Sequence, residues 1–351
     1  MNIVTNRILI TGANGWLGKR LARLVARREL DAGVLSNLPA DSSLRCLILP
    51  AEKPDELRQI GAEVTGGDIR NSSDCAAFCE GAKGAILIHT AGVIHPARVK
   101  DFYDVNLTGT QNILKAAAAA GIKRVVVVSS NSPLGVNHSL TERFDERSEY
   151  HPYKNYGRSK MQAELFVRKF EKENGLECVI VRPPWFYGPD QPARQTLFFT
   201  MIKAGKAPIV GSGDNLRSMA YVDNLCEGLL LAATVERAAG QTYWIADRRP
   251  YSMNEIIDTV EQLLEKEFKM PVAHKRMRLP NAASDIASVA DSMLQSLGVY
   301  NQKVHVLSEM NKTIACSIAK AEAELGYNPK ISLEEGMRRS LSFCLENGIR
   351  I

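Results

Sequence analysis

The chain has 351 residues, of which 45% are hydrophobic and 24% are charged, and its formal net charge at pH 7 is +5. This composition is typical of a globular protein of roughly two domains. The positive charge is not gathered into a basic run, so we expect no nucleic-acid partner. No apolar run approaches the ~18 residues that a membrane span needs, so we expect no membrane partner.

The seven cysteines are scattered and form no C-x-x-C motif. Cys75 and Cys79 could share a helix face, but two ligands without a second pair make a poor metal site, so we expect no metal. Reduced thiols and the lack of a signal peptide before the first apolar run favour a cytoplasmic location.

The first expected element is a strand at 8–11 that breaks at Gly12. Apolar residues from Leu17 onward then recur at helical spacing. Glycines at 12, 15 and 18 leave a turn without side chains, where backbone N–H groups and a helix N-terminus can approach a pyrophosphate. For this G-x-x-G-x-x-G spacing taken alone, a glycine-rich turn without a ligand is the alternative.

The second expected strand, at 44–49, ends without the acidic residue that binds a ribose 2′-hydroxyl in NAD-specific folds. Glu52 comes late, and Lys53 and Arg45 are nearby cations, so NAD and NADP both remain open. The next short strand ends at Asp68, which could accept a hydrogen bond from an adenine amino group or cap the helix that follows.

Strand and helix continue to alternate as far as Arg182, which predicts a parallel, doubly wound α/β sheet. The further strands are expected at 84–89, 123–128 and 177–182, and long helices at 104–120 and 153–174. Beyond Arg182 several prolines break the alternation. We therefore expect a Rossmann-type dinucleotide-binding domain over 1–182, with a strand near 241–246 returning to its sheet. A smaller, mostly helical substrate-binding domain is expected over 183–351.

Two groups of polar residues are candidates for a catalytic site. Ser129 and Ser130 follow the apolar run 125–128, at the edge of the sheet where ligands bind. Tyr156 and Lys160 share one face of the next helix, because residues four apart point the same way. A nearby ammonium and an oxidised nicotinamide would lower the phenol pKa from ~10 toward a useful range. An isolated Y-x-x-x-K pair is more often an ordinary solvated helix pair.

The chain resembles the extended branch of the short-chain dehydrogenase/reductase superfamily, which holds sugar-nucleotide epimerases, dehydratases and hydroxysteroid dehydrogenases. The resemblance covers nearly the whole chain. Its motifs, in order, are Thr11-Gly12-x-x-Gly15-x-x-Gly18, Asp68, Thr90-Ala91-Gly92, Asn106-x-x-Gly109-Thr110, Ser129-Ser130, Tyr156-x-x-x-Lys160 and the blocks 182–189, 217–224 and 320–329.

The resemblance implies a role for each motif. Tyr156 would be the general acid/base, Lys160 would hydrogen-bond the nicotinamide ribose, and Ser130 would hold the substrate oxygen. The cofactor would be NAD or NADP, and the residues expected around it are Gly12, Asn14, Gly15, Trp16, Leu17, Gly18, Asp68, Ile69, Thr90, Ala91, Gly92, Asn106, Ser129, Tyr156, Lys160 and Pro183. The substrate would lie against Ser130, Ser132, Trp185 and Arg217. His89 is expected near the cofactor as a structural residue.

Departures from the family pattern bear on the substrate. The 4,6-dehydratases of this branch carry Asp-Glu after the catalytic hydroxyl, whereas this chain has Asn131-Ser132, which disfavours water elimination. Trp185 replaces the asparagine of many sugar-nucleotide epimerases and weakens that assignment. The helical insertion at 279–298 resembles the hydroxysteroid group.

Arg217, in contrast, matches the arginine that sugar-nucleotide enzymes direct at a substrate phosphate. The alternative is that it pairs with Asp214 or Asp223 on a surface loop. We expect an NAD(P)-dependent enzyme moving hydride at a secondary alcohol or ketone, first as an epimerase or reductase of a nucleotide sugar. The alternatives are a hydroxysteroid-like or other apolar alcohol as substrate and, from another class, a catalytically silent dinucleotide-binding regulator.

The resemblance also implies a homodimer, formed by the helices at 106–120 and 156–170. The sequence features that support it are the small residues at 116–120 and apolar Met161, Leu165 and Val167. Alternatively, these helices only cover the sheet.

Overall fold

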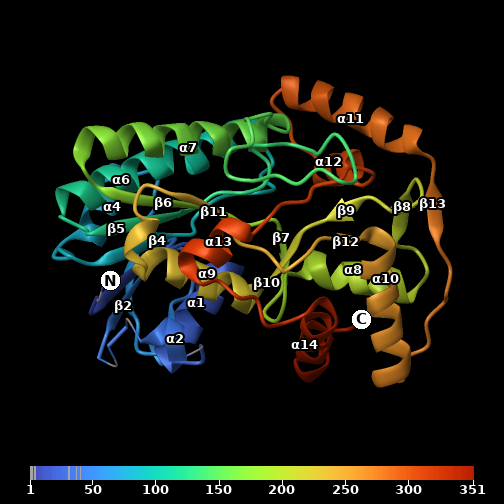
Figure 1. The fold of residues 1–351 in the computed structure, drawn as a ribbon, viewed down its shortest axis with the longest axis horizontal. Helices are drawn as coiled ribbons and strands as arrows, with labels where there is room; N and C mark the ends of the chain where they lie inside the picture. The colour runs from blue at the N-terminus through green and yellow to red at the C-terminus, as the bar shows by residue number, and fades with distance from the viewer. Residues whose placement is uncertain (1–2, 4, 31, 37, 40) are drawn as a thin grey trace.

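The fold comes from a computed structural model that describes residues 3, 5–30, 32–36, 38–39 and 41–351. A seven-stranded parallel sheet forms one half of the molecule, and most of the later elements form the other half (Figure 1). The doubly wound α/β class is therefore confirmed. The sheet runs in the order β11 (Thr242–Trp244), β6 (Glu177–Arg182), β5 (Arg124–Val128), β4 (Ile86–His89), β1 (Arg7–Thr11), β2 (Ser43–Ile48) and β3 (Glu63–Gly66).

The order of the strands reverses between β1 and β4. From β1 the chain proceeds outward through β2 and β3, and from β4 it proceeds the other way through β5 and β6. Thr11 and His89 are paired at the carboxyl ends of β1 and β4. Ligands of open α/β sheets bind at such a reversal, so this edge is where the site is built.

Alternating side chains give the sheet two buried faces. Ile8 and Ile10 pack with α1 (Trp16–Arg27) and α9 (Val222–Thr234), whereas Leu9 packs on the opposite face. The opposite face is covered by α4 (Ser72–Cys79), α6 (Thr110–Ala119) and α7 (Lys154–Asn174), which lie side by side in Figure 1. Short helices α2 (Ala32–Leu35) and α3 (Asp55–Gln59) complete this half.

The helix expected from 104 to 120 has two parts, a π-helical stretch from Tyr103 to Gly109 and then α6. The short helix α5 (Val99–Phe102) precedes them. The wider turn brings Asn106 inward, where its amide accepts a hydrogen bond from the Val93 N–H at 2.9 Å and donates to the Val93 carbonyl at 3.0 Å. Sequence periodicity did not predict this change of pitch, because the apolar spacing of the segment is helical throughout.

Three of the residues assigned to a dimer face lie in the core instead. Ala116, Ala117 and Val167 are buried on the α6–α7 face of the sheet. Leu165 points the other way and is 51% exposed. The outer face of these helices therefore carries less apolar surface than expected from the sequence.

The second half contains three two-stranded sheets as well as helices. The strand pairs are β7 (Trp185–Tyr187) with β10 (Met219–Tyr221), β9 (Leu216–Arg217) with β12 (Tyr251–Ser252), and β8 (Pro208–Val210) with β13 (Met277–Leu279). The helices are α8 (Ala193–Lys203), α10 (Met253–Gln262), α11 (Asn281–Ser296), α12 (Gln302–Glu309), α13 (Ala319–Leu325) and α14 (Leu333–Glu346), with short turns at Glu236–Ala238 and Leu263–Glu267.

Two segments of the second half return to the central sheet. The strand β11 pairs in parallel with β6, and α9 packs beneath the sheet. In the part of the chain that the structure describes, no helix has the length and apolar character required to cross a membrane.

Candidate active site

The three glycines of the first turn differ in what surrounds them. Gly12 has a φ of +68°, and a Cβ there would lie 2.7 Å from the Cα of Ala91. A Cβ on Gly18 would lie 2.3 Å from the carbonyl oxygen of Gly12, so glycine allows α1 to pack closely on β1. Gly15 is exposed at the N-cap of α1, and a Cβ there would meet only the same carbonyl. The turn has the open backbone and helix N-terminus that a pyrophosphate requires.

The neighbouring side chains fix this turn in place. Asn14 donates to the carbonyl of Lys53, after β2, at 3.0 Å. The indole N–H of Trp16 donates to the carbonyl of Pro189 at 2.7 Å, which ties the turn to the second half. Leu17 is buried in the core. Of the expected cofactor-binding residues of this segment, the glycines therefore leave space and the others hold the turn in shape.

Asp68 lies at the end of β3 and is bound by Arg70. The Arg70 Nε and backbone N–H donate to its carboxylate at 2.9 to 3.0 Å, and these hydrogen bonds hold its pKa below the usual value. The cap of α4 is Asn71, so the capping role considered for Asp68 is wrong. The carbonyl of the adjacent Ile69 accepts a hydrogen bond from Asn112 at 3.0 Å.

The charged groups beside β2 are engaged within the protein. Glu52 accepts a hydrogen bond from the backbone N–H of Leu49 at 3.0 Å. Arg45 forms an ion pair with Glu63 at 2.9 Å. Arg45 is thus paired at the outer edge of the sheet, whereas Glu52 is exposed and keeps one carboxylate oxygen free of the Leu49 hydrogen bond.

His89 is buried between two threonine hydroxyls. Its Nδ1 lies 2.7 Å from Thr11 Oγ1 and its Nε2 lies 3.0 Å from Thr110 Oγ1. Because the Thr110 hydroxyl donates to the Asn106 carbonyl, it accepts the proton from Nε2, and Nδ1 accepts from Thr11. Burial, together with the charge of Lys160, lowers the pKa of His89 to about 3. His89 is thus a neutral structural residue, as the sequence suggested.

The segment after β4 lies against Lys160. The Thr90 hydroxyl donates to the carbonyl of Thr11 at 2.7 Å, which joins the ends of β1 and β4. A Cβ on Gly92 would lie 3.2 Å from Lys160 Nζ and 3.1 Å from Asn106 Oδ1. The expected cofactor-binding backbone and the expected catalytic lysine are therefore neighbours.

The three serines after β5 have different partners. Ser129 donates to the buried carboxylate of Glu164 at 2.5 Å, so its hydroxyl faces the core, although it was expected at the cofactor. Ser130 hydrogen-bonds the Tyr156 phenol. Ser132 is buried, and its hydroxyl lies 3.4 Å from that of Ser130. Ser130 is the serine that meets the expected acid/base.

Tyr156 and Lys160 are both buried on one face of α7. Lys160 donates to the carbonyl of Val128 at 3.1 Å, and burial, opposed by Glu164, lowers its pKa to about 8. Burial raises the pKa of Tyr156 to about 12, opposed by the hydrogen bond with Ser130. The direction for Tyr156 is opposite to that expected, because burial outweighs the charges that face the phenol in the protein alone.

Aromatic residues that the sequence did not single out surround Tyr156. The ring of Phe102 lies 5.7 Å from that of Tyr156 and 5.1 Å from that of Tyr300, between centroids. The Tyr300 hydroxyl is 2.7 Å from Nδ1 of His95. These residues come from the loop after β4, from α5 and from the loop between α11 and α12, so no local pattern could have grouped them.

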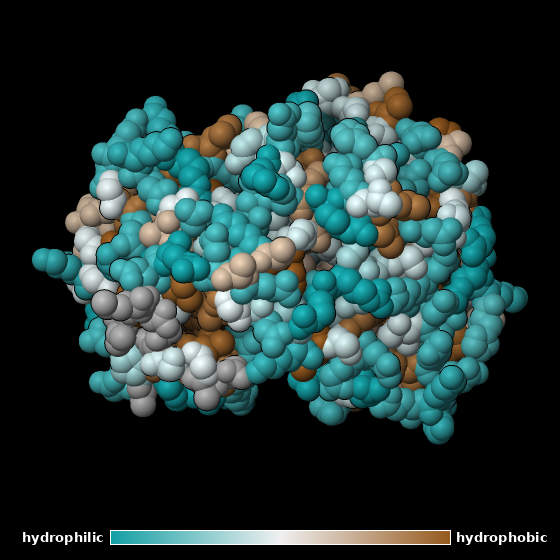
Figure 2. Space-filling model, in the orientation of Figure 1, coloured by the Kyte–Doolittle hydropathy of each residue, from teal (hydrophilic) through white to brown (hydrophobic). Residues whose placement is uncertain are grey.

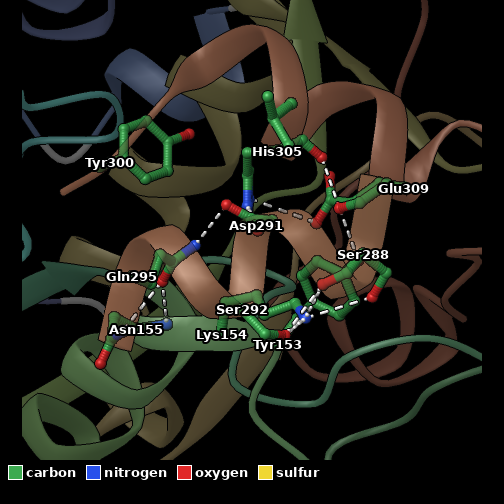
Figure 3. Close-up of polar contacts among 12 residues, drawn as sticks. Tyr153, Lys154, Asn155, Ser288, Asp291, Ser292, Gln295, Tyr300, His305 and Glu309 are labelled. Carbon is green, nitrogen blue, oxygen red and sulfur yellow. Dashed lines mark hydrogen bonds and ion pairs between the residues drawn. The ribbon is translucent and has the colours of Figure 1, made fainter. Parts of the chain in front are cut away.

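The insertion that contains α11 is fastened to the start of α7, as Figure 3 shows. Lys154 Nζ donates to the carbonyl of Ser288 at 2.9 Å. The Asn155 side chain donates to Gln295 at 2.9 Å. Both residues of α7 stand just before Tyr156, so α11 is attached beside the turn that carries Tyr156.

A buried pair joins α11 to α12. Asp291 accepts from Nδ1 of His305 at 2.8 Å, and the two side chains are 0% and 7% exposed (Figure 3). The His305 ring lies 5.2 Å from that of Tyr300. This pair therefore supports the loop that carries Tyr300 over the site.

Arg217 lies in β9 and donates to the carbonyl of Glu309, at the end of α12. Burial lowers the pKa of this guanidinium. Asp223 forms an ion pair with Arg20 at 2.6 Å, and Asp214 accepts from an asparagine. The surface pairing of Arg217 with either acid is therefore wrong, and the side chain is held at the end of α12 instead.

Trp185 stands in β7, half-buried, with its ring 5.6 Å from Phe198. Pro183 is buried between β6 and β7. Trp185 packs against the hydrophobic cluster of the second half.

Arg194 is a second arginine near the site that the sequence did not indicate. It lies in the first turn of α8, and its charge acts on Tyr156, Tyr300 and His95. Among the described residues no carboxylate forms an ion pair with it. The end of the site near Tyr156 thus has an arginine that is not neutralised by any described carboxylate.

Known proteins resemble the chain over nearly its full length. An uncharacterized protein, y4nL of Sinorhizobium fredii, is 52% identical over 97% of this chain and 96% of its own. The 3beta-hydroxysteroid-dehydrogenase/decarboxylase isoform 1 of Arabidopsis thaliana is 27% identical over 95% of this chain and 78% of its own. The N-acetyl-alpha-D-glucosaminyl-diphospho-ditrans,octacis-undecaprenol 4-epimerase of Escherichia coli O157:H7 is 25% identical over 97% and 96%.

Among solved structures, the DesIV double mutant, a dTDP-glucose 4,6-dehydratase from Streptomyces venezuelae with NAD and DAU bound, has a TM-score of 0.72. It is 26% identical and covers 97% of each chain. The model of one family matches residues 8–246, which include the glycine turn, Ser130, Tyr156 and Lys160. The chain belongs to the NAD dependent epimerase/dehydratase family.

Proposed function

We propose that this protein moves a hydride at a secondary alcohol or ketone of a small molecule, with NAD or NADP as its cofactor and in the cytoplasm. The observation that carries the proposal is the meeting of Ser130 and Tyr156 beside Lys160, which itself lies against Gly92. The open glycine turn fits a dinucleotide pyrophosphate. The cofactor, when bound, accepts or donates the hydride.

Each of the side chains at the site has a separate role in binding or proton transfer. Ser130 holds the substrate oxygen, and Tyr156 gives or takes the proton at that oxygen. Lys160, buried and held by the Val128 carbonyl, hydrogen-bonds the cofactor ribose and supplies positive charge near the phenol. The aromatic rings of Phe102 and Tyr300 exclude water from this proton transfer.

The substrate class that we propose first is a nucleotide-linked sugar, acted on by an epimerase or reductase. Arg217 supports it, because a guanidinium offers a planar fork that matches phosphate oxygens. Arg194 adds a second cation near the reacting group. The Escherichia coli and Streptomyces relatives act on sugars that carry a diphosphate.

A second candidate is an apolar alcohol such as a hydroxysteroid. The rings of Phe102 and Tyr300 form a buried hydrophobic cluster with Tyr156, and such apolar surroundings of the acid/base suit an apolar molecule. The Arabidopsis relative is a hydroxysteroid dehydrogenase/decarboxylase.

The first test is Tyr156→Phe. We expect cofactor affinity to change little and turnover to fall by roughly 10²-fold or more, the usual effect of losing a positioned acid/base. Fluorescence titration with NADH and NADPH measures affinity, and assays on candidate alcohols measure turnover. Tyr243→Phe, whose hydroxyl bonds Glu324 far from the site, is the control. Turnover near that of wild type in Tyr156→Phe would contradict the proposed role.

The second test decides between the substrate classes. UDP, GDP and dTDP are titrated calorimetrically into wild type and Arg217→Ala with cofactor saturating. If Arg217 holds a diphosphate, its loss removes a charge-assisted contact of about 1.5–3 kcal/mol, or roughly ten- to a hundred-fold in affinity. Cofactor binding should stay the same. A wild-type protein that binds none of these nucleotides would favour the apolar alcohol.

A further inference from the structure

Three side chains converge on one buried carboxylate beside the site. Glu164 lies on α7, one turn after Lys160, and is 1% exposed. Arg182 Nη2 donates to it at 2.6 Å, the Ser129 hydroxyl at 2.5 Å and the Tyr150 hydroxyl at 2.8 Å. A buried charge with this many donors is held in one position.

The donors come from separate elements that meet at the catalytic edge. Ser129 directly follows β5, and Arg182 is the last residue of β6. The backbone N–H of Ser129 also donates to the carbonyl of Val181 at 2.8 Å. Glu164 thereby ties α7, which carries Tyr156 and Lys160, to the turn that carries Ser130.

The charge of Glu164 also matters to Lys160. The groups that face Lys160 are the Val128 carbonyl, the Gly92 backbone, neutral His89 on β4 and Glu164 on its own helix. Of the described carboxylates, Glu164 is the one whose charge acts on it. Burial lowers the pKa of Lys160 to about 8, and Glu164 opposes that fall.

We propose that Glu164 is a positioning residue of the reaction, which keeps Lys160 protonated and fixes the Ser129–Ser130 turn against the catalytic helix. This inference rests on the proposed function. Arg182 holds Glu164 in turn, and its guanidinium lies over the rings of Tyr150 and Trp244 at 5.4 and 5.9 Å.

The same two strands supply a matched control pair. Arg124 begins β5 and Glu177 begins β6, and their side chains pair at 2.9 Å at the opposite edge of the sheet. Arg124 is buried like Arg182. The Glu177 side chain is 25% exposed and that of Glu164 is 1% exposed, so a variant at Glu177 weakens a less buried pair from the same two strands without touching the catalytic edge.

The experiment measures NADH and NADPH affinity by fluorescence titration from pH 6 to 10. Lys160 holds the ribose as an ammonium, so affinity should fall as pH rises through its pKa. In Glu164→Gln the midpoint of this fall should move down by one pH unit or more, the scale for losing an opposite charge within ~4–6 Å. Glu177→Gln should leave the midpoint in place.

A second variant separates charge from folding. Glu164→Gln leaves Arg182 buried without its anion and lowers stability, whereas Glu164→Gln with Arg182→Met removes both charges and should recover much of it. We expect the lowered midpoint to persist in the double variant, and Glu164→Asp to restore it in part. A midpoint that is unshifted both in folded Glu164→Gln and in the double variant would show that the charge of Glu164 does not act on Lys160, and would overturn the proposal.

Failure of this inference and failure of the proposed function have different signatures. If Tyr156→Phe keeps full turnover, the assignment of the reaction fails whatever happens at Glu164. If Tyr156→Phe is inactive and Glu164→Gln binds cofactor with an unshifted midpoint, only the positioning role fails.

Discussion

His89 is held neutral by the hydroxyl on each side of its ring. Protonation would place a second N–H against Thr11 Oγ1, which already donates to that nitrogen. The pKa of His89 is about 3 in the fold, because of burial and of the charge of Lys160. An unfolded histidine titrates near ~6.5.

This pKa difference predicts a loss of stability in acid. Between about pH 6.5 and 3 the unfolded chain binds a proton that the folded His89 does not, so stability falls as pH falls, by at most ~1.4 kcal/mol per unit. In His89→Gln this contribution is absent, and the difference in urea midpoint between pH 7 and pH 5 should be smaller than in wild type.

His151→Gln is the control, because that side chain is 68% exposed. Burial and nearby cations lower the pKa of His95 to about 4, which acts in the same direction as His89, whereas burial raises that of Asp247 to about 6, which acts against it. His95 and Asp247 are unchanged in wild type and in both variants, so their contributions cancel in the comparison. An equal acid response in wild type and His89→Gln would contradict the assignment.

For single residues, the sequence could predict the positions of side chains that belong to one local motif. Tyr156 and Lys160 share a helix face, and Gly12 and Gly18 stand where α1 meets β1. The sequence could not predict that the Ser129 hydroxyl points into the core. Its orientation depends on a hydrogen bond to Glu164, which Arg182 holds in place. Contacts between residues far apart in the chain cannot be recognised from the spacing of residues in the sequence.

At the scale of elements, the α11–α12 insertion depends on Asp291. This carboxylate accepts from His305 and from Gln295. Asp291→Ala leaves two buried donors without an acceptor, at about 1–3 kcal/mol for each. We expect faster amide hydrogen exchange across 281–309 and a raised KM for substrate, with cofactor affinity unchanged.

Asp285 on the same helix gives the control. Its side chain is 65% exposed and pairs with Lys312 at 3.3 Å, so Asp285→Ala should cost ~1 kcal/mol or less. If the amide hydrogens of 281–309 exchange at the same rate in Asp291→Ala and Asp285→Ala, the Asp291–His305 pair does not hold the insertion in place.

The strands and the longer helices of the first half could be predicted because each is an apolar or amphipathic run bounded by glycine, proline or polar turns, whereas the short helices α2 and α3 were not predicted. The helix at 281–296 was also expected, but its place beside Tyr156 was not. That place depends on contacts such as Lys154 with Ser288, which connect positions far apart in the chain. Tyr300 and Arg194 were missed for the same reason.

At the scale of the whole molecule, we propose a homodimer through the outer face of α6 and α7. Leu165 is the exposed apolar residue of that face that supports it. Wild type should sediment as a dimer at micromolar concentration, and Leu165→Arg as a monomer. Leu197→Arg, on α8 with a side chain 56% exposed, should remain a dimer. Sedimentation of the wild-type protein as a monomer would contradict the proposed dimer.

The place of β11 at the edge of the sheet has a consequence for synthesis of the chain. Its partner β6 ends at Arg182, but β11 itself ends at Trp244. A nascent chain that has left the ribosome only as far as β6 therefore presents an unpaired strand edge and, without α9, an uncovered apolar face. Such edges recruit other strands. We therefore expect the exposure of this strand edge and apolar face to last until the second half has been translated as far as β11.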